Sequence, residues 1–242
     1  MNTIDRFISQ IHANRWHRYF YLCCRVLLGY AFLVAGLVKI VGDRFASGLS
    51  EIHPMGAYLT ALLETGLYYR FIGWSQVVAA ILILIPRTVA MGAVLYFPII
   101  LNICVLSISV RFEGSIVTTP LMVLANVYLL VWNLPKFKPL ISLNAPTAVT
   151  RMGRKESLDS SFPTGFFMGV AASALCVLLL AQKGCDIMPR NSLQDCVLQY
   201  QGTPLEASAV EFCKCVHSEG LGLETCLDQL EMRESSLNAP LD

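Results

Sequence analysis

Charged residues are scarce in this sequence. They make up only 14% of its 242 residues, whereas an ordinary soluble domain carries about 25%. The net charge is +1, so the sequence lacks the basic excess that marks a nucleic-acid-binding protein. Regular alternation of apolar and polar residues, which marks a membrane barrel, is also missing. Hydrophobic residues make up 55% of the chain and are gathered into long runs, which excludes a disordered chain and a soluble enzyme.

Five apolar runs are each close to the roughly 20 residues needed to cross the hydrocarbon of a bilayer. They cover residues 19–41, 68–85, 88–110, 115–133 and 162–181. A backbone surrounded by lipid must satisfy its own hydrogen bonds, so each run predicts a helix. The sequence therefore predicts an all-α, multi-pass membrane protein, with a four-helix transmembrane bundle, a fifth transmembrane helix and a small helical C-terminal tail.

The basic residues predict the orientation, because short cytoplasmic segments are enriched in Lys and Arg. One side would receive Arg6, Arg15, Arg18, Arg87, Lys136, Lys138, Arg151, Arg154 and Lys155, and the other only Arg44, Arg70 and Arg111. We therefore expect a bacterial inner-membrane protein with a cytoplasmic N-terminus and a periplasmic tail. The predicted segments are a cytoplasmic arm (1–18), the four-helix unit (19–134), a cytoplasmic linker (135–161), the fifth helix (162–182) and the tail (183–242).

Three carboxamide side chains, Gln76, Asn102 and Asn126, lie near the middle of the second, third and fourth runs. Polar groups inside a membrane cost free energy, so they are candidates for function. If they converge on one buried patch, their NH₂ groups could donate hydrogen bonds to an apolar carrier such as a quinone. The alternative is hydrogen bonding between helices. No Asp, Glu or His lies near the centre of a run, which disfavours a proton-driven carrier.

Two cations, Arg25 and Lys39, lie toward opposite ends of the first run. Long basic side chains can reach a membrane interface, which favours an anchoring role. Alternatively, they close a cavity and compensate an anion or a reduced quinone. In that case Arg111 and Glu113, between the third and fourth runs, line its outer mouth; otherwise these two form a solvated charge pair.

The fifth run contains Gly165-x-x-x-Gly169. Small residues at this spacing let helices approach closely. We expect this face to dock the fifth helix on the bundle or on a second copy of the chain, which would make a homodimer.

Five of the nine cysteines lie in the tail: Cys185, Cys196, Cys213, Cys215 and Cys226. In an oxidising compartment this density predicts a disulfide framework, and a tail of short helices needs such staples because it buries little core. Cys213 and Cys215 point about 200° apart on one helix, so they cannot bridge each other. One arrangement joins Cys196 to Cys213 and Cys215 to Cys226, but spacing alone leaves the connectivity open.

An odd number of tail cysteines leaves one thiol free, paired with another chain, or exchanging within a bridge. Cys185, Cys213 and Cys215 are therefore candidate redox thiols that would exchange electrons with a quinone. A metal site made by Cys213, Cys215 and His217 lacks a recognised spacing, and we expect no metal.

The first run has the pattern Arg25-x-x-x-Gly29-x-x-Phe32-x-x-x-Gly36-x-x-Lys39. Further matching residues are Gln76, Pro86, Arg87, Pro98, Asn102, Phe112, Asn126 and Trp132. Over residues 20–133 the chain resembles the DoxX-like membrane proteins, a resemblance that implies a four-helix inner-membrane unit. Characterised members include a subunit of an archaeal thiosulfate:quinone oxidoreductase and a mycobacterial member of a thiol-stress oxidoreductase complex. The fifth run and the tail depart from the four-span form.

Two functions follow as hypotheses. The first is quinone-linked redox handling of thiols or sulfur compounds, as part of a membrane oxidoreductase system with a periplasmic or oxidoreductase partner. The second is a non-catalytic assembly protein of the lipid bilayer, whose acidic, cysteine-rich tail docks a periplasmic protein.

Overall fold

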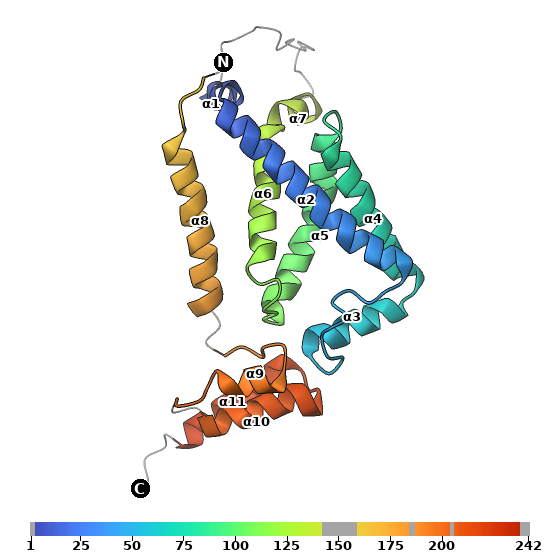
Figure 1. Cartoon of the computed structure of the whole chain (residues 1–242), viewed down its shortest axis with the longest axis vertical. Coiled ribbons are helices and arrows are strands. Elements are labelled where there is room, and N and C mark those ends of the chain that lie inside the picture. The colour runs from blue at the N-terminus through green and yellow to red at the C-terminus, as the bar shows by residue number, and fades with distance from the viewer. Residues whose placement is uncertain (1–2, 142–158, 184–186, 204–205, 238–242) are drawn as a thin grey trace.

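The computed structural model describes residues 3–141, 159–183, 187–203 and 206–237, and every regular element in these ranges is a helix (Figure 1). The membrane-type helices are α2 (Arg15–Val41), α4 (Leu67–Leu84), α5 (Val89–Ser109), α6 (Thr118–Trp132) and α8 (Thr164–Lys183). The remaining helices are α1 (Thr3–Ala13), α3 (Pro54–Glu64), α7 (Leu134–Ile141), α9 (Leu193–Leu198), α10 (Glu206–Lys214), η1 (Cys215–Glu219) and α11 (Leu223–Leu237).

Four of these helices, α2, α4, α5 and α8, are long and apolar enough to cross a membrane. The prediction of a helical multi-pass membrane protein is confirmed at this level. The fourth predicted run forms a shorter apolar helix, α6, of 15 residues, which spans about 22 Å at 1.5 Å per residue. Its first residues are used instead in a turn, where the Ser107 and Ser115 hydroxyls lie 2.6 Å apart.

The contact between α2 and α4 depends on two glycines that face each other. A Cβ added to Gly36 would lie 2.7 Å from the Gly73 carbonyl oxygen, and one added to Gly73 would lie 2.8 Å from the Gly36 carbonyl oxygen. Side chains are therefore excluded at this crossing. Close backbone approach at small residues is how helices pack in lipid, where apolar burial gives little driving force.

The bundle core lies where α2, α4, α5 and α6 meet. Phe32 of α2 stacks on Tyr96 of α5 with ring centroids 3.5 Å apart, and the Tyr96 hydroxyl donates to the Leu28 carbonyl at 3.3 Å. Leu129 brings α6 into the same buried cluster.

One end of the bundle, here called the N-terminal end, holds the start of α2. Asn14 caps α2 by accepting from the backbone N–H of Trp16, so the first long helix starts four residues before the predicted Tyr19. The predicted arm is therefore mostly helix α1, and the predicted linker begins as α7; residues 142–158 of that linker lie outside the described residues. Asn14 also bonds the Ser161 carbonyl at 2.8 Å, which ties the start of α8 to the start of α2.

Helix α8 packs on the bundle mainly through its first two turns. The Phe166 ring lies 4.2 Å from His17, 5.3 Å from Phe20 and 5.6 Å from Tyr128. Beyond this aromatic cluster α8 runs beside α6 toward the tail (Figure 1), and no residue of its apolar window is buried.

The tail is a small helical unit at the opposite end, the tail end (Figure 1). Ser192 caps α9 by accepting from the Asp195 N–H at 3.1 Å, as a Ser-x-x-Asp sequence indicates. Gly220 ends η1 with φ of +68°, a left-handed conformation that glycine adopts without steric cost. The core of the unit consists of residues from α9, α10, η1 and α11.

Candidate functional site

The three carboxamides do not form one buried patch. Asn126 is fully buried, and its Nδ2 donates to the Ala93 carbonyl of α5 at 3.1 Å. Gln76 is also buried, but Asn102 is exposed on the outer surface of α5. The expected convergence of all three is therefore wrong, because Asn102 points away from the bundle. The Oε1 of Gln76 and the Oδ1 of Asn126 are buried without a hydrogen-bond partner.

This arrangement changes the chemistry that the site offers. The NH₂ group of Asn126 is already used between helices, so its free group is the oxygen. A free amide oxygen accepts a hydrogen bond. Asn126 therefore suits a ligand with a donor, such as a hydroxyl, better than a ligand with only carbonyl oxygens.

Arg25 and Lys39 are buried and bound to backbone carbonyls. Arg25 donates from Nε to the Ile83 carbonyl at 3.0 Å and from Nη2 to the Leu84 carbonyl at 2.7 Å. These carbonyls end α4 and lack helical partners, so Arg25 caps that helix. Lys39 donates to the Ala35 carbonyl at 3.1 Å and lies 4.4 Å from the Phe45 ring centroid. These contacts connect the side chains to the backbone, and they leave fewer donor groups for an anionic ligand.

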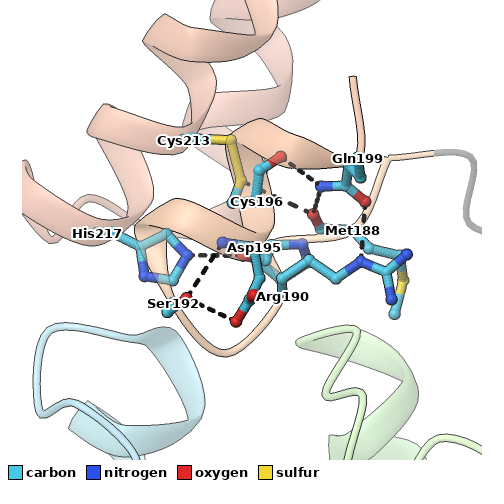
Figure 2. Close-up of a disulfide and its surroundings, with 9 residues drawn as sticks. Met188, Arg190, Ser192, Asp195, Cys196, Gln199, Cys213 and His217 are labelled. Atoms are coloured by element: carbon cyan, nitrogen blue, oxygen red, sulfur yellow. Dashed lines mark hydrogen bonds between the residues drawn. A yellow bond between two sulfur atoms is a disulfide. The ribbon is translucent and has the colours of Figure 1, made fainter. Parts of the chain in front are cut away.

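Cys196 and Cys213 of the tail form one disulfide (Figure 2). Cys215 and Cys226 form another. This pairing is the one named from the sequence, where the spacing of the cysteines left other pairings open. All four cysteines are at most 3% exposed, so neither bridge is open to a thiol from solution. Cys213 and Cys215 are bonded and buried, which argues against their assignment as redox thiols and against a metal site with His217. Cys185 lies outside the described residues.

The remaining described cysteines lie in the membrane-type helices. Cys24 and Cys104 are buried, whereas Cys23 and Cys176 are exposed. No group of three or more His, Cys, Asp or Glu side chains could hold a metal ion among the residues that the structure describes.

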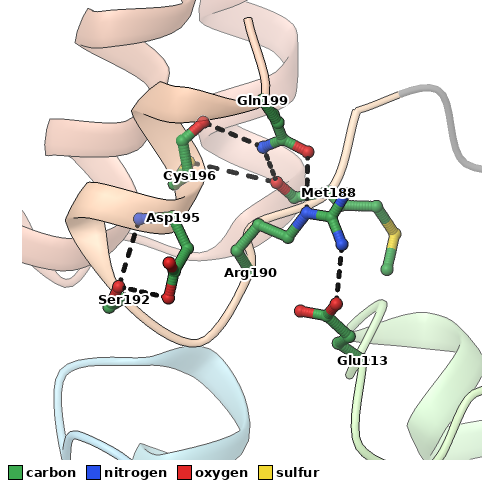
Figure 3. A network of polar contacts seen from close by, with 7 residues as sticks. All are labelled: Glu113, Met188, Arg190, Ser192, Asp195, Cys196 and Gln199. Atoms are coloured by element: carbon green, nitrogen blue, oxygen red, sulfur yellow. Dashed lines mark hydrogen bonds and ion pairs between the residues drawn. The ribbon is translucent and has the colours of Figure 1, made fainter.

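The tail docks on the tail end of the bundle through two arginines that belong to different segments. Arg190 of the tail forms a 2.6 Å ion pair with Glu113 in the α5–α6 turn (Figure 3). Arg111 of that turn donates to the Ile187 carbonyl at 2.6 Å. Arg111 and Glu113 therefore bind the tail, and the expected solvated pair between them is wrong, because each has a partner in the tail instead.

Arg190 also connects this docking contact to a disulfide. Its Nε donates to Gln199 Oε1 at 3.0 Å, and Gln199 Nε2 donates to the Met188 carbonyl at 2.6 Å (Figures 2 and 3). Gln199 follows α9 directly, the helix that holds Cys196. The disulfide therefore stabilises the helix that orients Arg190 toward Glu113.

His53 lies in the same contact region and is 1% exposed. Its Nδ1 accepts from the Met55 N–H at 3.1 Å and so caps α3, while its Nε2 has no hydrogen-bond partner. The His217 ring of the tail lies 5.7 Å away. Burial, followed by the proximity of His217, lowers the pKa of His53 to about 4. In the sequence, the position of His53 directly before Pro54 is the only sign that it lies at the start of a helix.

A cavity of about 450 Å³ lies at the N-terminal end of the bundle. It is lined by Gln10, Ile11, Ala13, Asn14, His17, Asp159, Ser161 and Pro163. The described polar groups there are largely engaged: Asn14 bonds Trp16 and Ser161, and the Asp159 carboxylate accepts from the Ser161 N–H and hydroxyl. None of the predicted site residues lines this cavity.

Comparison with known proteins adds one relationship. No protein-family model matches the chain, and no solved structure matches it. A stretch of 110 residues is 34% identical to the uncharacterized protein YwoB of Bacillus subtilis (strain 168). The matched stretch covers 43% of this chain and 71% of YwoB. The chain therefore belongs to the same family as YwoB.

Proposed function

We propose that the protein is a non-catalytic, DoxX-like membrane assembly protein that associates through helix α8, and that its partner in the bilayer is a second copy of the chain. In this proposal five helices span a bacterial inner membrane, with the N-terminus in the cytoplasm and the tail in the periplasm. The observation that carries the proposal is that α8 has no buried residue in its apolar window. A membrane helix whose residues are at most half-buried leaves surface for a partner.

The small residues of α8 support a specific face for this contact. Gly165, Gly169, Ala172 and Cys176 are exposed and fall within about 60° around the helix axis at 100° per residue. A Cβ added to either glycine would meet nothing within 4 Å. The half-buried residues on the side of the bundle are centred about 140° away; they are Phe166, Phe167, Val170, Ala174, Val177 and Ala181. The stripe of small residues is therefore free for another helix.

The candidate catalytic groups support a non-catalytic role. The described tail cysteines are in buried disulfides, and the two buried cations bind backbone carbonyls. The outward face of α11 instead carries Glu224, Asp228 and Glu231, which are exposed and one turn apart on one side of the helix. This acidic face suits a periplasmic protein with a basic surface.

Cross-linking of Cys176 in native membranes tests the proposal. A parallel dimer through the stripe brings two Cys176 thiols together, so a lipid-soluble oxidant should yield a covalent dimer. Gly169→Ile should abolish the dimer, whereas Leu178→Ile, on another exposed face of α8, should not. Cys23 is exposed on α2 and gives the control, because Cys23→Ala should leave cross-linking intact. A monomer in membranes, with no Cys176 dimer, would overturn the proposal.

The second candidate function is quinone-linked redox chemistry, and the unpartnered oxygens of Gln76 and Asn126 favour it. Each is a buried acceptor that a hydroquinone hydroxyl could satisfy. Alkylation of the tail cysteines in membranes with an oxidised or a reduced quinone pool tests this function. The redox function is supported if the number of free tail thiols changes with the redox state of the quinone pool, and if Gln76→Leu removes this change. Disulfides that stay oxidised in both conditions would rule it out.

A further inference from the structure

The contact between the tail and the bundle contains a buried histidine, His53, that lies beside the His217 ring of the tail. His53 has its Nδ1 bonded to the Met55 N–H and its Nε2 unpartnered, at 1% exposure. A neutral ring fulfils this role, because its Nδ1 must be deprotonated to accept. A protonated ring has a donor on both nitrogens and cannot accept from Met55.

The two arginines of this contact both have a left-handed backbone. Arg111 has φ of +49° and Arg190 has φ of +54°, conformations that a residue with a side chain adopts only at a cost in free energy. Of the three non-glycine residues with positive φ in the described ranges, these two make the contacts between tail and bundle. Each docking side chain therefore leaves the backbone at a tight turn, and the turn at Arg111 is closed locally by the Phe112 N–H, which donates to the Ser107 carbonyl at 2.9 Å.

We propose that the contact is an acid-opened latch, in which protonation of His53 releases the tail from the end of the bundle. This inference goes beyond the proposed function and does not depend on it. In the latched state His53 is neutral and buried against Phe112 and His217. In the released state the ring is hydrated and free to take up a proton.

The charged groups on the elements packed around His53 offer it no free anion. The His217 ring of η1 lies 5.7 Å away, the Arg190 guanidinium is bound to Glu113 and Gln199, and Arg111 of the α5–α6 turn donates to the Ile187 carbonyl. The acidic side chain of that turn, Glu113, is bound to Arg190. On the loop before α3, Arg44 binds the Leu49 carbonyl and Glu51 is exposed. A proton on His53 therefore enters a site with no free buried anion among the described residues.

The sign of the effect follows from linkage. Burial and His217 lower the pKa of His53 from its ordinary 6.5 to about 4, and the Arg190 carbonyl opposes this more weakly. Docking is therefore fully favoured above pH 6.5 and weakens as the pH falls toward 4. If the released ring has the ordinary value, the docking constant falls about thirtyfold between pH 7.5 and pH 5.

Hydrogen–deuterium exchange tests the latch. The full-length protein is measured in lipid nanodiscs at pH 7.5 and pH 5, and the rates are corrected for the intrinsic effect of pH on exchange. Peptides that cover residues 50–60 and 187–200 should both lose protection at pH 5, by up to about thirtyfold in exchange rate. A peptide from the centre of α4 should not change. Equal protection of the two contact peptides at both pH values would overturn the proposal.

Two variants separate the latch from a general acid effect. His53→Asn keeps a side-chain acceptor for the cap of α3 but cannot titrate, so its contact peptides should stay protected at pH 5. Glu113→Gln breaks the ion pair and should weaken protection at both pH values while keeping the pH response. If His53→Asn is unprotected even at pH 7.5, His217→Gln, which keeps a donor for the Pro189 carbonyl, gives the second test through a reduced pH response. An unchanged pH response in both histidine variants would refute the role of these rings.

Discussion

Replacement of Gly36 by alanine should destabilise the bundle more than the addition of a single methyl group would suggest. The added methyl carbon would lie 2.7 Å from the Gly73 carbonyl oxygen and 2.8 Å from Val77 Cγ2, well inside van der Waals contact. Since the first obstacle is backbone, a side-chain rotation cannot relieve it. Helices α2 and α4 must therefore separate, which also loosens their neighbouring contacts.

The expected cost is about 2 kcal/mol, within the usual range for overpacking of a well-packed interior. Gly73→Ala should cost a similar amount, because its Cβ meets the Gly36 carbonyl oxygen and Lys39 Cβ, both at 2.8 Å. One separation of α2 from α4 relieves both clashes. The double variant should therefore cost clearly less than the sum of the single variants, a non-additivity expected for residues in contact.

Thermal unfolding of the purified protein in one detergent provides the measurement. Gly48→Ala is the control, since a Cβ at this position meets nothing within 4 Å. The reasoning fails if Gly36→Ala unfolds at the same temperature as this control. It also fails if the costs of Gly36→Ala and Gly73→Ala simply add, because α2 and α4 would then not share one contact.

Two further predictions concern the tail and the buried amide. Joint replacement of Cys196 and Cys213 by serine removes a bridge between residues 17 apart in sequence and should destabilise the tail by about 3 kcal/mol. A protease added to intact membranes should then digest the tail faster. Unchanged digestion would show that the tail helices stay folded without this disulfide. In the detergent assay, Asn126→Leu should lower the stability of the bundle by about 1 kcal/mol, because it loses the hydrogen bond to Ala93. Asn102→Leu should leave the stability nearly unchanged. A larger loss for Asn102→Leu than for Asn126→Leu would contradict the burial of these side chains.

The helices were predictable from sequence because their signals are local. Apolar runs of suitable length predicted α2, α4, α5 and α8 within a few residues at most of their ends. Ser192 and Asp195 predicted the start of α9, since a cap depends only on residues three apart. The pairing of Cys196 with Cys213 and of Cys215 with Cys226 could be proposed from the sequence, because helix geometry forbids a bridge between Cys213 and Cys215.

The site was less predictable because sequence position gives depth in a membrane but not rotation about a helix axis. Helix α5 is apolar on every side, so nothing marked Asn102 as facing outward. The short α6 depends on a hydroxyl pair between Ser107 and Ser115. Contacts between Arg190 and Glu113, which are 77 residues apart, have no local signal at all.

The unequal lengths of α6 and α8 have a consequence for the surrounding lipid. Helix α8 has 20 residues and α6 has 15, so about 30 Å of one helix lies beside about 22 Å of the other. If both cross the same bilayer, acyl chains next to α6 must compress, or its ends must be shielded by α7 and the 110–117 turn. A sterol-thickened or long-chain membrane would increase this mismatch on one flank of the protein only.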